Sequence, residues 1–320
     1  MIPFDDVDDE FLSVATQAMS ASSGGEALSA LGWWDLLGHL DDPDARSALL
    51  VAFRAQGRAL ASSQALGGLL AAPFLEGTAA ASEWAVAAVR RTSTRRGPVW
   101  VVVGDVTDRP CLFADPSEGL FVVDASSVSL TPIEVPGALT LHEATFDASS
   151  HTPLTPRLDE RAYSRSLFLG RLAAATEILG ATERAVALAV DYARDREQFG
   201  IPIGTYQAIR HLLAWARTDC VAIDATARTA LDLFDHPPAH LDKVVKALAG
   251  RNGRRACERS LQVLGGIGFT AEHAHHHHHS RVLLLDSLLG TSAELSFELG
   301  KWLRETGSRP DYAHALVMTR

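Results

Sequence analysis

The hydrophobic positions of the chain change their spacing twice. Residues 1 to about 85 are dominated by Ala and Leu, and between Asp44 and Leu70 apolar side chains recur at helical spacing. From about residue 95, short runs rich in β-forming residues replace this pattern. They are Pro98–Val103, Leu120–Val123 and, more weakly, Leu139–Phe146, each bounded by turn residues. We therefore predict a helical N-terminal domain over residues 1–94 and a reduced β domain over residues 95–150, too short for a complete barrel.

Helical spacing returns near Leu158 and continues almost to the end of the chain. One apolar face runs from Phe168 to Ala193, which predicts a helix of about seven turns. Further helices are expected from about Thr205 to Phe234 and from about Leu241 to Leu264, the latter ended by two glycines. Thr291-Ser-Ala-Glu294 forms a capping box that starts a last helix. Long helices with short links predict a C-terminal four-helix bundle over residues 151–320, and hence a mainly α chain with a small β unit.

Composition excludes several classes of protein. The net charge of −10 argues against nucleic-acid binding, and no apolar run approaches the roughly 20 residues of a membrane span. The first ten residues are acidic, unlike a secretory signal. Three widely spaced cysteines without a CxxC pair fit a reducing compartment. We therefore expect a cytoplasmic protein that interacts with neither nucleic acid nor membrane.

Two segments of the predicted bundle are far from generic. The first combines Gly170-Arg171, the run Tyr192-Ala-Arg-Asp-Arg-Glu-Gln-Phe-Gly200 and Gln207; the second is Gln262-Val-Leu-Gly-Gly-Ile-Gly-Phe-Thr270. Their order and spacing strongly resemble the C-terminal domain of acyl-CoA dehydrogenases, flavoprotein oxidoreductases of lipid metabolism. This resemblance covers about half the chain, residues 158–305.

The resemblance implies FAD as cofactor. A planar guanidinium can grip phosphate oxygens with paired hydrogen bonds, and Arg196 matches the family arginine that reaches the pyrophosphate of FAD held mainly by a neighbouring subunit. Phe199 is then expected to pack nearby and Gln207 to supply a polar contact. Gln262 and the backbone of Gly265 and Gly266 match the segment that meets the adenosine half. Arg171 matches an arginine near the family's substrate site.

The catalytic base of the family is missing. The glutamate that removes the α-proton of the acyl-CoA matches Leu289, and the alternative position, just before Arg171, is Gly170; neither can accept a proton. Asp286 is the nearest candidate for a displaced base, whereas the capping box accounts for Glu294. The flavin-covering segment of the family's middle domain is also not found in this sequence.

These departures leave three hypotheses. The first is a base-lacking subunit of a heteromeric acyl-CoA dehydrogenase, paired with a second acyl-CoA dehydrogenase-like chain for FAD-dependent α,β-dehydrogenation of a bulky or sterol-derived acyl-CoA; the isolated chain would be inactive. The second is a structural or regulatory pseudoenzyme with no redox role, which binds a partner and need not bind flavin. The third is an active homo-oligomer with an unrecognised base.

A run of five histidines, His275–His279, offers a metal-binding interpretation, because helical histidines four residues apart can share a metal ion. No acidic or Cys ligands cluster nearby in sequence. We therefore expect no metal site, and a His-rich patch that is solvated or faces another subunit.

Overall fold

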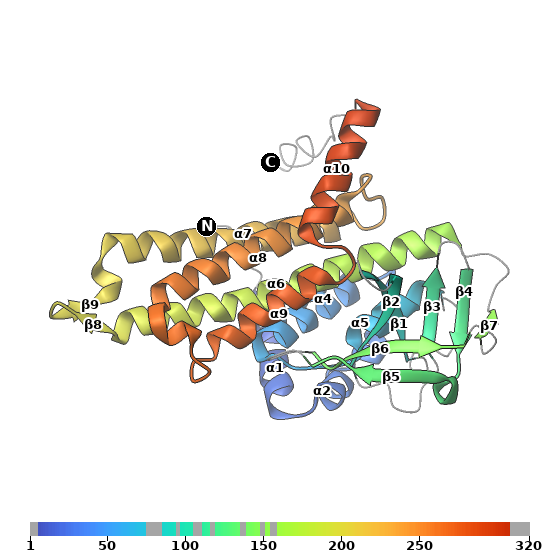
Figure 1. Ribbon diagram of the computed structural model, residues 1–320, viewed down its shortest axis with the longest axis horizontal. Coiled ribbons are helices and arrows are strands. Elements are labelled where there is room, and N and C mark those ends of the chain that lie inside the picture. Colours follow the sequence, from blue (N-terminus) through green and yellow to red (C-terminus); the bar gives the residue numbers. More distant parts are fainter. Residues whose placement is uncertain are drawn as a thin grey trace.

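A computed structural model describes residues 6–74, 85–93, 97–104, 111–115, 119–134, 139–147, 151–153 and 159–307. Figure 1 shows long helices lying side by side, with a smaller group of strands at one end. The predicted domain boundaries at residues 94 and 150 lie outside the described residues.

The N-terminal part is helical, as predicted. Its core is closed by Trp33 and Phe53, whose rings meet edge to face at 6.4 Å and are fully buried. Asp42 caps the longest helix by accepting a hydrogen bond from the backbone of Asp44, with Pro43 at the first position. The helices are α1 (Asp6–Ala21), α2 (Gly24–Ala30), α3 (Trp33–Leu37), α4 (Pro43–Ala59), α5 (Ala65–Ala71) and the short 3-10 helix η1 (Ala72–Phe74).

The β region is a seven-stranded sheet in the order β5-β6-β2-β1-β3-β4-β7, antiparallel except between β1 and β3. Phe113 and Phe121 stack at 5.4 Å in its small separate core, and Phe146 packs against both rings. The strands are β1 (Ala85–Ser93), β2 (Gly97–Val103), β3 (Cys111–Asp115), β4 (Gly119–Val123), β5 (Val128–Pro132), β6 (Leu141–Phe146) and β7 (His151–Pro153), with the 3-10 helix η2 (Ala125–Ser127) between β4 and β5.

The sheet is larger than the sequence predicted, and it begins earlier. The three predicted runs correspond to β2, β4 and β6, but β1 lies inside the stretch predicted to be helical. Its segment Ala85-Val-Ala-Ala-Val has high intrinsic helix propensity. Pairing with β2 on one side and β3 on the other overrides that propensity.

The C-terminal part is a helical bundle, as predicted. Helix α6 (Glu160–Asp195) spans its whole length, and α7 (Gln207–Asp232) and α8 (Leu241–Leu264) pack along it. The prediction placed one helix after α8, whereas the structure has two. Helix α9 (His275–Ser287) packs against α6 and α8, and α10 (Ser292–Thr306) packs on α8 and projects from the body in Figure 1. The predicted capping box opens α10, with Thr291 and Glu294 bonded reciprocally.

Helix α4 packs so closely on α6 that only glycine fits at the crossing. A Cβ on Gly180 would lie 1.9 Å from the carbonyl oxygen of Arg54, and one on Gly57 would lie 2.1 Å from that of Glu177. A buried ion pair fastens the same region, since Arg281 of α9 donates to Glu177 of α6 at 2.5 Å and to the carbonyl oxygens of Leu60 and Ala61. These contacts join the N-terminal helices and the bundle into one packed unit.

No helix in the described part of the chain is both long enough and apolar enough to cross a membrane.

Candidate functional site

The two sequence motifs meet at one end of the bundle. Arg196 is the C-cap of α6: its backbone N–H donates to Tyr192, and its side chain is exposed. The chain then forms the hairpin β8 (Glu197–Gln198) and β9 (Ile201–Pro202), followed by the 3-10 helix η3 (Ile203–Thr205). Phe199 sits at the hairpin turn with a left-handed backbone (φ 55°) and 93% of its surface exposed. Gln207, also exposed, opens α7 immediately afterwards.

The second motif occupies the end of α8. Gln262 is exposed on the last turn of that helix, and Gly265 ends it with φ 62°, as the glycine pair predicted. The 3-10 helix η4 (Gly265–Phe269) follows. A Cβ added at Gly265 or Gly266 would meet no atom within 4 Å, so this stretch of backbone is open to an incoming group.

A small apolar cluster holds these segments together. Ala189 and Ala193 of α6 pack there against Val263 and Leu264 of α8, with Ile209 of α7 against them. The six residues predicted to bind cofactor therefore lie on neighbouring segments at one end of the bundle, although the sequence separates the two motifs by about 60 residues.

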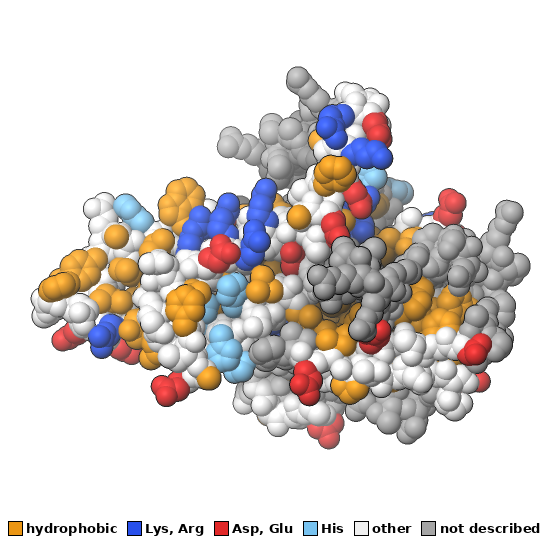
Figure 2. Space-filling view, in the orientation of Figure 1, with side chains coloured by type: hydrophobic (Ala, Val, Ile, Leu, Met, Phe, Trp, Pro, Cys, Tyr) orange, Lys and Arg blue, Asp and Glu red, His pale blue; other side chains and the backbone are white. Residues whose placement is uncertain are grey.

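Large apolar side chains surround this end and are left in solvent. Figure 2 shows hydrophobic side chains gathered over the end of the molecule that carries β8 and β9. Their exposed fractions are 93% for Phe199, 77% for Phe269, 61% for Trp215, 43% for Ile201 and 39% for Ile267. Exposed apolar groups of this size mark a surface that another molecule covers.

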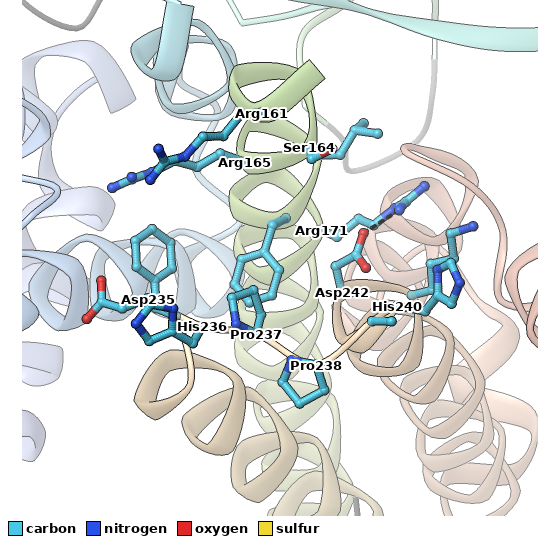
Figure 3. A pocket seen from close by; sticks show the side chains of 15 residues that line it. Arg161, Ser164, Arg165, Arg171, Asp235, His236, Pro237, Pro238, His240 and Asp242 are labelled. Atoms are coloured by element: carbon cyan, nitrogen blue, oxygen red, sulfur yellow. Dashed lines mark hydrogen bonds and ion pairs between the residues drawn. The ribbon is translucent and has the colours of Figure 1, made fainter. Parts of the chain in front are cut away.

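Arg171 lies elsewhere, far back along α6. From Arg171 to Arg196 is 25 residues, which at 1.5 Å per residue places them about 37 Å apart along the helix axis. Arg171 is 9% exposed and lines a cavity of about 660 Å³ between the first half of α6 and the α7–α8 connection. Figure 3 shows Arg161 and Arg165 on the same stretch of α6, with Asp242 beside Arg171.

Internal contacts hold the guanidinium of Arg171. Its Nε donates to the carbonyl oxygen of Leu289 at 3.0 Å, and Nη1 donates to Asp242 at 2.5 Å. The cavity walls combine apolar surface, including Phe168 and Phe234, with four Arg or Lys side chains and the carboxylates of Asp235 and Asp242. Such a cavity suits a ligand that has both apolar and anionic parts.

The position of the missing base is filled by hydrocarbon. Leu289 is 8% exposed, and its Cδ1 would lie 3.0 Å from a Cβ at Gly170. Leu70 of α5 closes the same place, with its Cδ2 2.4 Å from that Cβ position. The two positions where the family resemblance places a carboxylate therefore lie next to each other, a proximity that the sequence did not predict, and neither holds a titratable group.

The carboxylate of Asp286 makes structural hydrogen bonds, which do not suit a catalytic base. Its carboxylate accepts hydrogen bonds from the backbone N–H and the hydroxyl of Ser292, at 3.0 and 3.1 Å. Lys246, which is fully buried, lies 3.7 Å from the same carboxylate and donates to the carbonyl oxygens of Asp286 and Gly290. These bonds give Asp286 a role in fixing the α9–α10 corner, so it is a poor candidate for a displaced base.

The histidine run is not a solvated patch throughout. It forms the first turns of α9, where His275 is 0% and His278 is 4% exposed. The expectation of a solvated run is wrong for these two residues, because α9 lies against α6 and α8 and turns them inward. Among the described residues, no group of three or more His, Cys, Asp or Glu side chains is arranged to hold a metal ion.

The residues present fit FAD only as one side of its site. Arg196 can reach a phosphate, and the open backbone at Gly265 and Gly266 lets a nucleotide approach closely. Arg196, Phe199, Gln207, Gln262 and Gly266 are exposed, and Gly265 is half-buried.

Comparison with known proteins also finds a similarity to acyl-CoA dehydrogenases. Residues 161–296 match the family model described as "Acyl-CoA dehydrogenase, C-terminal domain". The chain is 38% identical over 136 residues to acyl-CoA dehydrogenase FadE34 of Mycobacterium tuberculosis. That match spans 41% of this chain but only 18% of the relative.

Solved structures extend the similarity in fold to nearly the whole chain. A variant of the Tcur3481-Tcur3483 steroid ACAD superposes with a TM-score of 0.74 at 22% identity, covering 95% of this chain and 99% of that one. The ChsE4-ChsE5 complex from Mycobacterium tuberculosis gives a TM-score of 0.72 at 20% identity, with 96% and 99% covered. Residues 161–296, less than half of the chain, are thus similar to the C-terminal domain of acyl-CoA dehydrogenases.

Proposed function

We propose that this chain is the base-lacking subunit of a heteromeric, FAD-dependent acyl-CoA dehydrogenase. Its family typically binds FAD. In this proposal a second acyl-CoA dehydrogenase-like subunit supplies the base and most of the flavin pocket. This chain contributes Arg196, Phe199, Gln207, Gln262, Gly265 and Gly266 to that flavin from across the interface. The assembly would work in the cytoplasm.

One observation carries the proposal: the base positions are packed with Leu289, Leu70 and Gly170, while the cofactor motifs remain presented on the surface. The separation of about 37 Å along α6 supports it further. FAD with its pyrophosphate at Arg196 would leave its flavin ring far short of Leu289. In this proposal, the cofactor contacts of this chain therefore serve a site on the partner subunit and not its own.

The proposed substrate is an acyl-CoA, and the names of the structural neighbours favour a steroid-derived acyl group. The cavity beside Arg171 is the candidate place for the anionic part of such a molecule. Arg161, Arg165 and Lys243 line it together with apolar surface. The packing of Leu70 and Leu289 would keep the acyl group from reaching a reactive position in this subunit.

A second candidate function is that of a structural or regulatory pseudoenzyme with no flavin. It is favoured by the closed base position and by the exposed apolar surface around Phe199 and Trp215, which suits a protein partner whether or not flavin is present. The two candidates differ in one property, the flavin content of the assembled complex.

The test is to purify the chain with its partner from the native host and to record the absorption spectrum and the mass of the complex. The proposal expects a yellow hetero-oligomer with fewer flavins than subunits, which reduces its flavin on addition of substrate. A colourless complex that gains no FAD on titration would favour the pseudoenzyme. An active complex of this chain alone would support the homo-oligomer hypothesis instead.

A further inference from the structure

Six histidines lie within seven residues where η4 leads into α9: His273 and the run His275–His279. Two of them point into the bundle and are buried almost completely, His275 at 0% and His278 at 4% exposure. The others are partly exposed. A cluster of imidazoles in a packed interface is unusual chemistry for a helix start, and the proposed function does not use it.

The surroundings of the two buried rings favour their neutral form. His275 places Nε2 3.1 Å from the carbonyl oxygen of Cys257 on α8, which accepts one ring N–H. Across the described residues, nothing within hydrogen-bonding distance is positioned for Nδ1 of His275, His277 or His278. A protonated imidazole has two N–H donors, so charging a buried ring would leave one of them without an acceptor.

The charged neighbours oppose protonation as well. His278 faces Arg184 of α6 and lies next to Arg281 of α9, whose guanidinium is bonded to Glu177. Burial first, and then these cations, lower the pKa of His278 to about 3. Burial and the neighbouring histidines lower the pKa of His275 to about 4.

The pKa values of other histidines in the cluster are lowered as well. Burial lowers the pKa values of His273 and His277, with His276 adding to the effect. Burial also lowers the pKa of His279, which lies between Glu258 and Arg254 of α8; the carboxylate opposes this shift and the guanidinium adds to it. Of the carboxylates on the packed helices, Glu258 of α8 acts on His279, and Glu177 of α6 is paired with Arg281.

We propose that the histidine cluster is an acid-sensitive latch, in which protonation of His275 and His278 releases the first turns of α9 from α6 and α8. The segment that would loosen with it is η4, only five residues upstream, which carries Gly265 and Gly266. The latch therefore couples pH to the surface that presents the second cofactor motif.

The sign of the effect follows from linkage. The rings hold fewer protons when packed than when released, so the packed state is favoured at high pH and loses ground as pH falls below the ordinary histidine value of 6.5. With two such rings, the ratio of released to packed molecules should rise on the order of 50-fold between pH 7 and pH 5.5. The release itself does not depend on the proposed function; only its consequence for FAD does.

Hydrogen–deuterium exchange of the full chain tests the release. After correction for the intrinsic rate at each pH, protection of α9 and η4 should fall steeply between pH 7 and pH 5.5, while peptides from α4 keep theirs. The double variant His275→Gln/His278→Phe should remove most of this acid response, because neither ring position can then take up a proton. His211→Gln, on the exposed face of α7, is the matched control and should respond as the native chain does.

Two outcomes would overturn the latch: pH-independent protection of α9 in the native chain, or an undiminished acid response in the double variant. Should the double variant fail to fold, proton NMR of the native chain decides, since a pKa above 6 for either ring contradicts the proposal. FAD titration of the assembled complex at pH 7 and pH 5.5 tests separately whether the release of α9 changes FAD affinity. Acid release of α9 without any change in FAD affinity would leave the latch standing and remove its link to the cofactor.

Discussion

Arg171 donates a hydrogen bond from Nε to the backbone carbonyl oxygen of Leu289, 3.0 Å away. Leu289 adopts a left-handed backbone with φ 59°, a conformation that bulky residues rarely take. Lys246 holds the carbonyl oxygen of the next residue, Gly290, so side chains of α6 and α8 together fix this corner. The position that the family resemblance assigns to a catalytic carboxylate is therefore held in place through its backbone, and its side chain is a hydrocarbon.

The isolated chain should not turn over acyl-CoA. General-base catalysis contributes about 10² to 10⁴-fold, and both base positions, Leu289 and Gly170, lack a titratable group. Reduction of an artificial electron acceptor by the purified chain with a panel of acyl-CoA substrates should stay at background. Sustained turnover by the chain without a partner would contradict the assignment of a base-lacking subunit.

Arg196→Ala should lower the FAD affinity of the assembled complex and leave the fold intact. The side chain is exposed at the end of α6, so its removal opens no cavity, while its charge-assisted bonds to phosphate are worth about 1.5–3 kcal/mol, or about ten- to a hundred-fold in affinity. Arg196→Lys should recover only part of the loss, because lysine lacks the planar fork.

The matched control for this change is Arg194→Ala, two residues earlier, where the arginine is 74% exposed and lies 3.8 Å from Asp191. It should affect FAD affinity little. FAD titration followed by flavin fluorescence measures all three variants. Equal affinities for the native complex and the Arg196→Ala complex would remove the support for a cofactor role of this motif.

Gly180→Ala should destabilise the chain strongly. A Cβ there would lie 1.9 Å from the carbonyl oxygen of Arg54, so α4 and α6 would have to separate; overpacking of this kind typically lowers the free energy of unfolding by about 1–3 kcal/mol. Gly300→Ala is the control, since it lies within α10 with no atom near the new Cβ and should stabilise by about 0.5–1 kcal/mol. Urea unfolding followed by circular dichroism compares them, and similar effects of the two changes would refute the close helix crossing.

Lys246 should make stability rise between about pH 8 and pH 10.5. Burial lowers its pKa from 10.5 to about 8, against the opposing effect of Asp286. In this window the unfolded chain holds a proton that the folded chain has lost, so the free energy of unfolding should increase with pH, by at most about 1.4 kcal/mol per pH unit.

Lys246→Met should remove this contribution, whereas Lys243→Met, at the neighbouring and less buried lysine, should keep it. Urea unfolding at pH 8, 9 and 10 gives the three slopes. If the unfolding free energy changes with pH equally in the native chain and in Lys246→Met, the pKa of Lys246 is not lowered by folding.

The sequence by itself determined the helical bundle and the identity of the motifs. Apolar residues at helical spacing predicted α6, α7 and α8. Each of these helices buries one continuous apolar face, and such a face shows in the sequence as a regular spacing of apolar residues. The capping box at Thr291 and the glycine stop at Gly265 were also local signals, and the structure has both. The prediction that the base position lacks a carboxylate likewise rests on the sequence alone, because it depends only on which residue type stands at Leu289.

Only the tertiary structure decided the rest, since it depends on partners distant in sequence. The Ala-rich segment of β1 became a strand because β2 and β3 offered it hydrogen bonds on both edges. His275 and His278 point inward because α9 lies against α6 and α8. A run of identical residues has no polar and apolar pattern that could indicate which of them are buried. Tertiary packing also brought Leu70 of α5 onto Gly170 of α6, a contact between residues 100 positions apart that no local pattern indicates.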